Sequence, residues 1–383
     1  MRPIYLDYNA TTPIDPAVVT AMEPYLKEHF GKPSSSHVFG HPTHDAVERA
    51  RESVADLLGA SANEIVFTGG GSEANNMAIK GVIFSLLSTW PPDDIHVITS
   101  SIEHQATLEP CAFLERLGCK VTRLPVDRFG VVSLDALRSS LKRQTQLVSI
   151  MYANNEVGTI QPISEIAQVA HEHGAMVHTD AAQVVGKIGV DVNKLGIDLL
   201  SVAGHKMYAP KGIGVLYVRR GVSLEPLIHG AGHESGRRAG TENVPYIVAL
   251  GVASQIAQKL LPDETFRLEK LRDLFWNELS KQLNDRLVLN GHSRLRLPNT
   301  LNVSITGCIG SDLLASVPDV AASTRSACHE GAVHLSPVLQ AMGVTEAVGK
   351  GAIRLSVGRF TTEEEIRRAA NLLAQHCLLG VGA

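Results

Sequence analysis

The chain has 383 residues, of which 44% are hydrophobic and 19% charged, and its formal net charge is -4. This length supplies apolar material for one large core or two unequal ones. The charge shows no basic excess, which argues against nucleic acid or an anionic membrane as the main partner. No apolar run reaches the ~18 uninterrupted residues of a membrane-spanning helix.

The cysteines are odd in number and none of them forms a C-x-x-C pair. The five are Cys111, Cys119, Cys308, Cys328 and Cys377. We therefore expect no disulfide framework, and a reducing cytoplasm is the predicted compartment. The opening residues MRPIYLDYNA contain Asp7 and no apolar h-region, so no secretory signal is expected in them.

Short apolar runs alternate with segments of helical period from about residue 14 to about residue 255. The runs predict seven strands, at 64–68, 95–100, 120–126, 146–153, 175–180, 198–203 and 213–219. Helical segments such as GSEANNMAIKGVIFSLL lie between them. This alternation predicts an α/β fold in which a mostly parallel seven-stranded sheet is covered by helices on both faces.

The pattern changes in the last third of the chain, where a charged amphipathic helix, two strands and a closing helix are predicted. Their ranges are 263–283, 299–305, 351–357 and 362–378. These elements are typical of a smaller α+β domain. We therefore divide the chain into a large domain, 14–258, and a small domain formed by 1–13 and 259–383.

Lys206 lies in AGHKMYAPKGIG, between the predicted strands 198–203 and 213–219. Ligands of α/β sheets bind at the carboxyl ends of strands, and Ala203 and Gly204 give this lysine little steric cover. A solvated lysine in a turn is an equally simple interpretation of these facts. A reactive amine becomes the better interpretation if the chain also supplies the other partners of an aldehyde cofactor.

Polar groups follow several other predicted strands. Pyridoxal phosphate needs a lysine, an acid for its ring nitrogen, a phosphate cradle and a ring stacker. Asp180 and Gln183 follow one strand, and TGGGSEANN places Ser72 where a helix begins, which favours a phosphate. His104 and Asn155 follow two more strands. Each has a plain alternative as a cap, turn or loop residue, but their convergence on one sheet edge predicts a cofactor pocket.

Ten motifs occur along the chain in the order YLDYNATTP, TGGGSEANN, EHQA, NNEVGT, HTDAAQ, GHKMYAPKGIG, GRRAGTEN, LPNTLNVS, SACHE and RLSVGRFTTEEEI. In these motifs, from residue 4 to about residue 375, the chain resembles the cysteine desulfurases of the NifS/IscS type. These are class-V aminotransferases of pyridoxal-phosphate fold type I. The resemblance implies a homodimer with a large cofactor domain and a small domain that carries the nucleophile and the substrate arginine.

The resemblance also implies roles for single residues. Lys206 would be the Schiff-base lysine, His104 would stack on the ring and serve catalysis, and Cys328 would be the nucleophile. Arg354, helped by Asn155, would bind the substrate carboxylate. The residues implied to contact pyridoxal 5'-phosphate are Gly71, Ser72, His104, Asn155, Asp180, Gln183, His205, Lys206 and, toward the partner subunit's phosphate, Thr241. No metal is implied.

The implied reaction takes sulfur from L-cysteine, leaves L-alanine, and passes a Cys328 persulfide to an acceptor protein. Ala203 stands where many relatives have Ser, so one phosphate hydrogen bond, typically worth roughly 1.5–3 kcal/mol, should be missing. Arg325 and His329 replace small or hydroxyl residues beside the thiol. The acceptor therefore stays open, with iron–sulfur assembly, tRNA thiolation and DNA phosphorothioation as candidate destinations.

Three other functions stay open. A selenocysteine lyase uses the same apparatus and shares SACH-like and SPVL-like elements. A different pyridoxal-phosphate enzyme, such as an aminotransferase, would need no thiol, and Cys328 argues against it. An inactive scaffold for sulfur-transfer partners is disfavoured by the intact Lys206, Asp180, His104 and Arg354.

Overall fold

One large sheet dominates the computed structural model, which describes residues 3–324, 328–329, 332–333 and 335–379, with the side chains of 328–329 and 332–333 outside the description. Its strand order is β2-β8-β7-β6-β5-β3-β4. The strands are β2 (Ile65–Thr68), β3 (His96–Ser100), β4 (Lys120–Leu124), β5 (Thr145–Ser149), β6 (Met176–Asp180), β7 (Leu199–Ala203) and β8 (Gly214–Val218). β8 runs opposite to the other six strands of this sheet and pairs antiparallel with both β2 and β7. The predicted mostly parallel seven-stranded sheet is confirmed.

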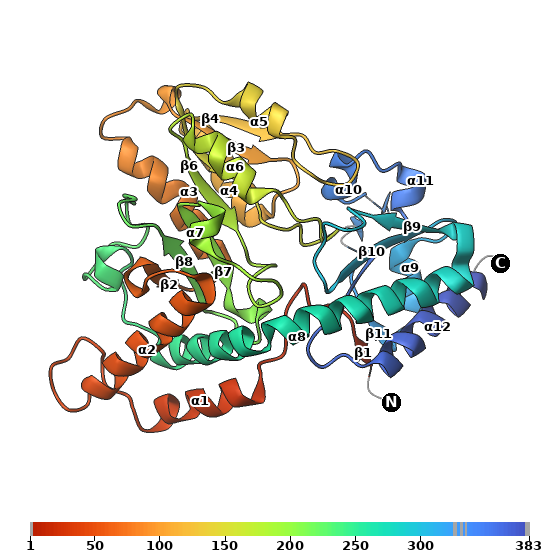
Figure 1. Ribbon diagram of the computed structural model, residues 1–383, viewed down its shortest axis with the longest axis horizontal. Coiled ribbons are helices and arrows are strands. Elements are labelled where there is room, and N and C mark those ends of the chain that lie inside the picture. Colours follow the sequence, from red (N-terminus) through yellow and green to blue (C-terminus); the bar gives the residue numbers. More distant parts are fainter. Residues whose placement is uncertain (1–2, 325–327, 330–331, 334, 380–383) are drawn as a thin grey trace.

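Helices cover both faces of this sheet (Figure 1). They are α1 (Pro16–Lys27), α2 (His41–Leu58), α3 (Gly71–Leu86), α4 (Gln105–Arg116), α5 (Leu134–Ser140), α6 (Ile163–His171) and α7 (Val192–Leu195). Successive strand residues point to opposite faces, so neighbours enter different clusters. Leu199 packs in the cluster of α3 and α4, whereas Leu200 packs in the cluster of α2 and α6. Burial on both faces explains why the strands consist of continuous apolar runs.

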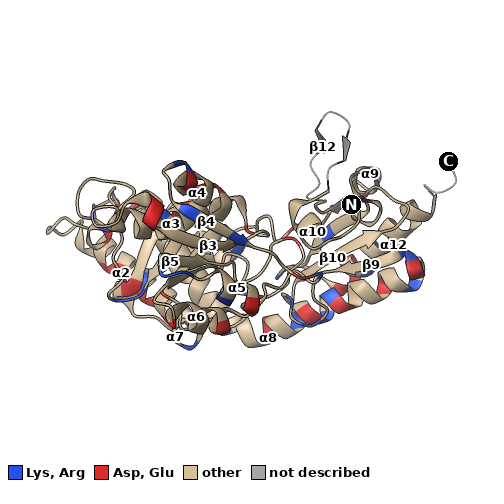
Figure 2. Ribbon diagram, turned by 90° about the horizontal axis from the view of Figure 1, so that it is seen from above, with Lys and Arg blue, Asp and Glu red and all other residues tan. Residues whose placement is uncertain are grey.

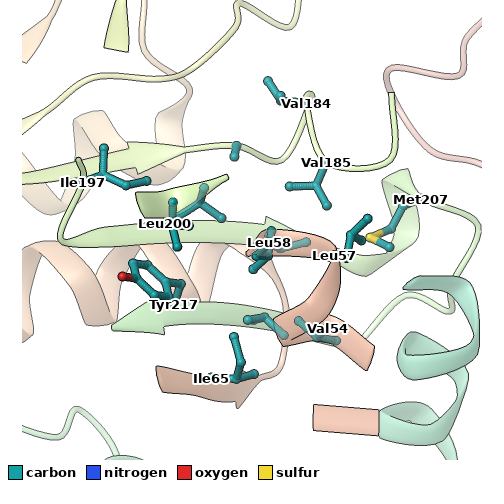
Figure 3. Packing of buried hydrophobic residues seen from close by; sticks show 14 of the residues in the cluster. Val54, Leu57, Leu58, Ile65, Val184, Val185, Ile197, Leu200, Met207 and Tyr217 are labelled. Carbon is teal, nitrogen blue, oxygen red and sulfur yellow. The ribbon is translucent and has the colours of Figure 1, made fainter. Parts of the chain in front are cut away.

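The packing of α2 fixes the β2, β8 and β7 side of the sheet (Figure 3). Val54 and Leu58 of α2 lie in one cluster with Ile65 of β2. Leu200 of β7 and Tyr217 of β8 belong to the same cluster and are almost fully buried. Burying side chains of this size stabilises the fold by roughly 1.5–3 kcal/mol each. The turn that carries Lys206 directly follows β7, so this packed region fixes the position from which the turn begins.

A second region contains a three-stranded antiparallel sheet in the order β14-β10-β9. Its elements are β9 (Leu287–Asn290), β10 (Thr300–Ile305), α9 (Gly310–Ser316), α10 (Pro337–Ala341), α11 (Glu346–Gly349), β14 (Ala352–Ser356) and α12 (Glu363–Leu379). Two short pairs join it: β1 (Ile4–Tyr5) with β11 (Val320–Ala321), and β12 (Cys328–His329) with β13 (Ala332–Val333). Ile4 and Leu6 are buried in its core, so the N-terminal segment packs there with the last third of the chain.

Helix α8 (Val244–Leu283) connects the two regions as one continuous helix of 40 residues, roughly 60 Å long. The sequence predicted only 263–283 as helix, and that start was wrong. The helix runs through Pro262, because Leu250 before it and Leu271 after it are buried in two different cores, which hold the helix on both sides. The domain boundary at 258/259 falls inside this helix, and the division into domains stays a prediction.

The charged residues of α8 lie outside its buried side, with the exception of Arg272. Figure 2 shows acidic and basic residues alternating along its carboxyl-terminal part. One 18-residue window within Val244–Arg286 is apolar enough to cross a membrane by length and composition, but 50% of that window is buried inside the protein. Packing against α1, α2 and α12 accounts for this apolar side, as in the core helix of a soluble protein.

We predict that Gly251→Val destabilises the protein, because α2 and α8 approach closely at this glycine. A Cβ at Gly251 would lie 2.6 Å from the Cα of Ala50. Overpacking of this kind typically costs about 1–3 kcal/mol. Urea denaturation would measure the loss in the free energy of unfolding. Gly189→Val is the control, since a Cβ there meets no atom within 4 Å, and equal stability of the two variants would contradict the prediction.

Candidate active site

A cavity of about 290 Å³ lies where the large sheet meets the small one. Its walls come from the segments that follow β2, β3, β5, β6 and β7, together with the N-terminal segment and β14. Nine of the predicted site residues line it: Gly71, Ser72, His104, Asn155, Asp180, Gln183, His205, Lys206 and Arg354. The fold therefore brings these residues together at the carboxyl edge of the strands, where ligands of α/β sheets bind.

The glycine-rich turn between β2 and α3 forms one wall of this cavity. Gly70 has a φ of 145°, a conformation that favours glycine, and a Cβ at Gly214 would lie 2.7 Å from the Gly70 backbone. A Cβ at Gly71 would lie 3.2 Å from the Cβ of Ala203. Gly71 and Ser72 open α3, so their backbone N–H groups have no acceptor within the helix. This cradle suits a phosphate group.

Asp180 ends β6 and is 8% exposed. Its Oδ2 accepts a hydrogen bond from Asn75 Nδ2 at 2.7 Å, and its Oδ1 accepts one from the Ala182 N–H at 2.9 Å. The carboxylate is therefore oriented from both sides. Asn75 was missed by the sequence analysis, although it lies in the TGGGSEANN motif. Its contact with a residue 105 positions away depends on the fold.

His104 is the N-cap of α4, and its Nδ1 accepts a hydrogen bond from the Ala106 N–H at 3.1 Å. Because Nδ1 accepts, the proton of the neutral ring lies on Nε2. The adjacent Glu103 is buried and accepts hydrogen bonds from Ser100 Oγ at 2.6 Å and from the Met151 N–H at 3.0 Å. Burial raises the pKa of Glu103 to about 8, despite these donors.

The turn that carries His205 and Lys206 is held by the N-terminal segment. Thr12 donates to the His205 carbonyl from its N–H at 2.9 Å and from its Oγ1 at 3.1 Å. Thr11 Oγ1 lies 3.1 Å from His205 Nδ1. Burial, followed by the charge of Lys206, lowers the pKa of His205 to about 4. The His205 ring is therefore neutral at pH 7 and can donate a hydrogen bond to an anion.

Arg354 is 2% exposed and forms an ion pair with Asp7, in which Nη2 lies 2.6 Å from Oδ1. Its Nη1 donates to the Asn155 carbonyl at 3.0 Å. Asp7 also accepts a hydrogen bond from Ser323 Oγ at 2.9 Å. The sequence analysis missed Asp7 as a site residue, although YLDYNATTP contains it. Asp7 and the Asn155 carbonyl together hold the guanidinium at the cavity wall.

Two predicted site residues do not line this cavity. Thr241 lies in a separate hollow of about 210 Å³ together with Thr68 and Arg238. The backbone of Cys328 lies on β12, where it is paired with Val333 of β13, and its thiol lies outside the described side chains. The roles of all the predicted site residues stay predictions. Within the described ranges, no group of three or more His, Cys, Asp or Glu side chains could hold a metal ion.

The chain matches the aminotransferase class-V family over residues 4–369. A cysteine desulfurase IscS from Dictyoglomus turgidum is 48% identical over 374 residues, covering 97% of this chain and 94% of the relative. Another, from Methanosarcina thermophila, is 46% identical and covers 98% and 92%.

Solved structures agree with these matches. A NifS-like protein superposes with a TM-score of 0.91 at 37% identity and covers 99% of both chains. A structure described as SspA in complex with cysteine has a TM-score of 0.83 at 38% identity and covers 94% of this chain and 99% of its own. The chain therefore belongs to the aminotransferase class-V family, whose members are pyridoxal-phosphate enzymes, and within it to the cysteine desulfurases.

We predict that Glu103 makes stability fall as the pH rises. Its pKa in the folded protein is about 8, against an ordinary 4.5, so between these values the folded state keeps a proton that the unfolded state has released. The free energy of unfolding then falls by at most about 1.4 kcal/mol per pH unit. In Glu103→Gln this contribution is absent.

Urea denaturation from about pH 5 to about pH 8 checks this prediction. The wild type should lose free energy of unfolding relative to Glu103→Gln as the pH rises, whereas the exposed control Glu109→Gln should run parallel to wild type. Parallel curves for wild type and Glu103→Gln would show that Glu103 titrates normally.

Proposed function

We propose that this protein binds pyridoxal 5'-phosphate in the cavity around Lys206 and removes sulfur from L-cysteine. One observation carries the proposal: Lys206, Asp180, His104 and Arg354, which lie far apart in the sequence, line a single cavity. The name of one structural relative, SspA in complex with cysteine, supports the same substrate. The implied products are L-alanine and a persulfide.

The residues of the cavity fit this cofactor. The glycine turn leaves room for a phosphate beside Ser72 and His205, and Asp180 is a buried carboxylate that can hold a ring nitrogen protonated. His104 would stack on the ring, and Gln183 would donate to its phenolic oxygen. Bound there, pyridoxal phosphate would supply an electron sink for the Cα of an amino acid.

Side chains of the protein itself would bind the substrate and transfer protons. Arg354 would bind the substrate carboxylate with its planar guanidinium, assisted by Asn155. Lys206 would hold the aldehyde carbon of the cofactor before the substrate enters and would then accept the proton from Cα. His104 carries its ring proton on Nε2 and would donate or accept a proton at the substrate.

Cys328 would be the nucleophile. Its thiolate would attack the sulfur of the bound substrate: the S–S bond forms as the Cβ–S bond breaks, and the electron pair of the broken bond stays on Cβ. A proton delivered to Cβ and the proton returned to Cα by Lys206 would complete alanine, and the persulfide would be left on Cys328. Ser323, which lines the cavity, is five positions from Cys328, so the Cα atoms of the two residues are at most about 18 Å apart.

The proposed assembly is a homodimer in the cytoplasm. Thr241 would reach the phosphate in the partner subunit, in agreement with its position outside the cavity of its own chain. The persulfide would pass to an acceptor protein, and the name IscS carried by the relatives favours iron–sulfur cluster assembly as its destination.

We predict that Lys206→Ala and Cys328→Ser fail at different stages. The wild type, reconstituted with pyridoxal phosphate, should show the cofactor's visible absorption band and form equal amounts of alanine and sulfide from L-cysteine in the presence of a thiol reductant. Lys206→Ala should lose the covalent cofactor and its band. Cys328→Ser should keep the band and lose the persulfide, measured by mass spectrometry of the protein.

Other outcomes would point elsewhere. A wild type without a band would favour the inactive scaffold. Dependence of turnover on an amino-group acceptor would favour an aminotransferase. A much higher turnover on selenocysteine than on cysteine would favour a selenocysteine lyase, and full persulfide formation by Cys328→Ser would remove Cys328 from its role.

We predict that Ala203→Ser slows dissociation of the cofactor. Ala203 lines the cavity beside Gly71, so a hydroxyl there would add one donor for the phosphate. A hydrogen bond to a charged group contributes about 1.5–3 kcal/mol, which corresponds to roughly tenfold or more in dissociation. Ser72→Ala should shift the rate in the opposite direction. An unchanged rate in Ala203→Ser would mean that the other donors already saturate the phosphate.

A further inference from the structure

Lys187 is a buried amine next to the cavity, in the turn that follows β6. It is 7% exposed, and burial, followed by the charges of Lys206 and Arg354, lowers its pKa well below the ordinary value. Among the described residues, no carboxylate forms an ion pair with it. Burying a lysine without a counter-ion costs free energy, whereas a lysine at the surface is solvated by water. The burial of Lys187 therefore needs a separate explanation.

The hydrogen bonds of Lys187 lead to Gln183. Lys187 Nζ donates to Gln183 Oε1 at 3.0 Å and lies 3.5 Å from Asn9 Oδ1. Gln183 Nε2 donates to the Asn9 carbonyl at 3.0 Å. The oxygen of the Gln183 amide thus accepts from an amine, and its nitrogen donates to a carbonyl. If the amide were flipped, its N–H groups would face the Lys187 amine and its oxygen would face the Asn9 carbonyl, and both contacts would be unfavourable.

This arrangement determines what Gln183 offers to the cavity. Its Nε2 carries two hydrogens, and the Asn9 carbonyl takes one of them. Gln183 lines the cavity, so the second N–H is the group that a ligand can use. Without the amine of Lys187, the amide oxygen could turn toward the cavity and would repel an anionic oxygen.

The turn that carries both residues is firmly held. Val184 and Val185, between Gln183 and Lys187, are buried in the same core cluster as Leu200 (Figure 3). The Lys187 carbonyl accepts a hydrogen bond from Thr265 Oγ1 of α8 at 2.7 Å. The backbone positions of Gln183 and Lys187 are therefore fixed, and the orientation of the amide depends on Lys187 at its oxygen and the Asn9 carbonyl at its nitrogen.

We propose that Lys187 is a positioning residue that acts through Gln183: it orients the amide so that Nε2–H faces the cavity and donates to an anionic oxygen of the ligand. This inference rests on the proposed function, in which that oxygen is the phenolic oxygen of the cofactor ring. The donated hydrogen bond stabilises the ionised form of the oxygen, so its loss raises the pH at which the oxygen ionises.

A double-mutant cycle in the reconstituted holoenzyme tests this. The variants are Lys187→Met, Gln183→Leu and the combination, and the readout is the pH midpoint at which the visible absorption of the bound cofactor changes. Gln183→Leu and Lys187→Met should each raise the midpoint by about one pH unit. The combined variant should show no more than the shift of Gln183→Leu. Lys194→Met, an exposed lysine of α7, is the control and should titrate like wild type.

Three results would overturn the inference. An unchanged midpoint in Lys187→Met would show that Gln183 needs no such orientation, and a combined shift equal to the sum of the single shifts would show that Lys187 acts by its charge alone. A midpoint that neither variant moves would show that Gln183 does not donate a hydrogen bond to the ligand. A wild type that retains no cofactor would instead refute the proposed function, and this inference with it. If Lys187→Met does not fold, Lys187→Gln takes its place in the same cycle.

Discussion

The whole site depends on one constraint, which is that parallel strands end at the same edge of a sheet. β3, β5, β6 and β7 run in parallel, so the residues that come after them enter one cavity from four directions. The reversed strand β8 returns the chain from the turn that holds Lys206 and pairs with both β7 and β2. Because β8 lies between them, the lysine turn and the glycine turn after β2 come to lie side by side.

The sequence was sufficient to predict the consequences of this constraint. Seven apolar runs corresponded to seven strands, because burial on both faces of a parallel sheet leaves a strong hydrophobic signal. Candidate residues placed directly after strands, such as Asp180 and Lys206, then lay at the cavity. The start of α8 was wrong because the charged amphipathic pattern covers only its second half, whereas the first half is held by packing in the core of the large sheet.

The residues that hold the site side chains in place could not be predicted from the sequence, for a different reason. Asp7 pairs with a residue 347 positions away, and Asn75 with one 105 positions away. Asn9 at the cavity wall and Lys187 behind it both hold the amide of Gln183, and their residue types alone give no sign of this role. The contacts of Asp7 and Asn9 depend on how the two sheets meet, and the contact of Asn75 depends on how α3 packs against the large sheet. No periodicity or spacing encodes either arrangement.

Residues 7–12 contact both sheets, and they connect the cofactor side of the cavity with its substrate side. Asn9 bonds to Gln183 on one side and to Thr300 of β10 on the other. Asp7 holds Arg354, while Thr12 holds the turn of His205. A shift of the small sheet would thus move the substrate arginine and the amide of Gln183 through the same six residues. The N-terminal segment therefore sets the geometry between the proposed substrate carboxylate and the proposed cofactor ring, although most of its contacts lie behind the cavity surface.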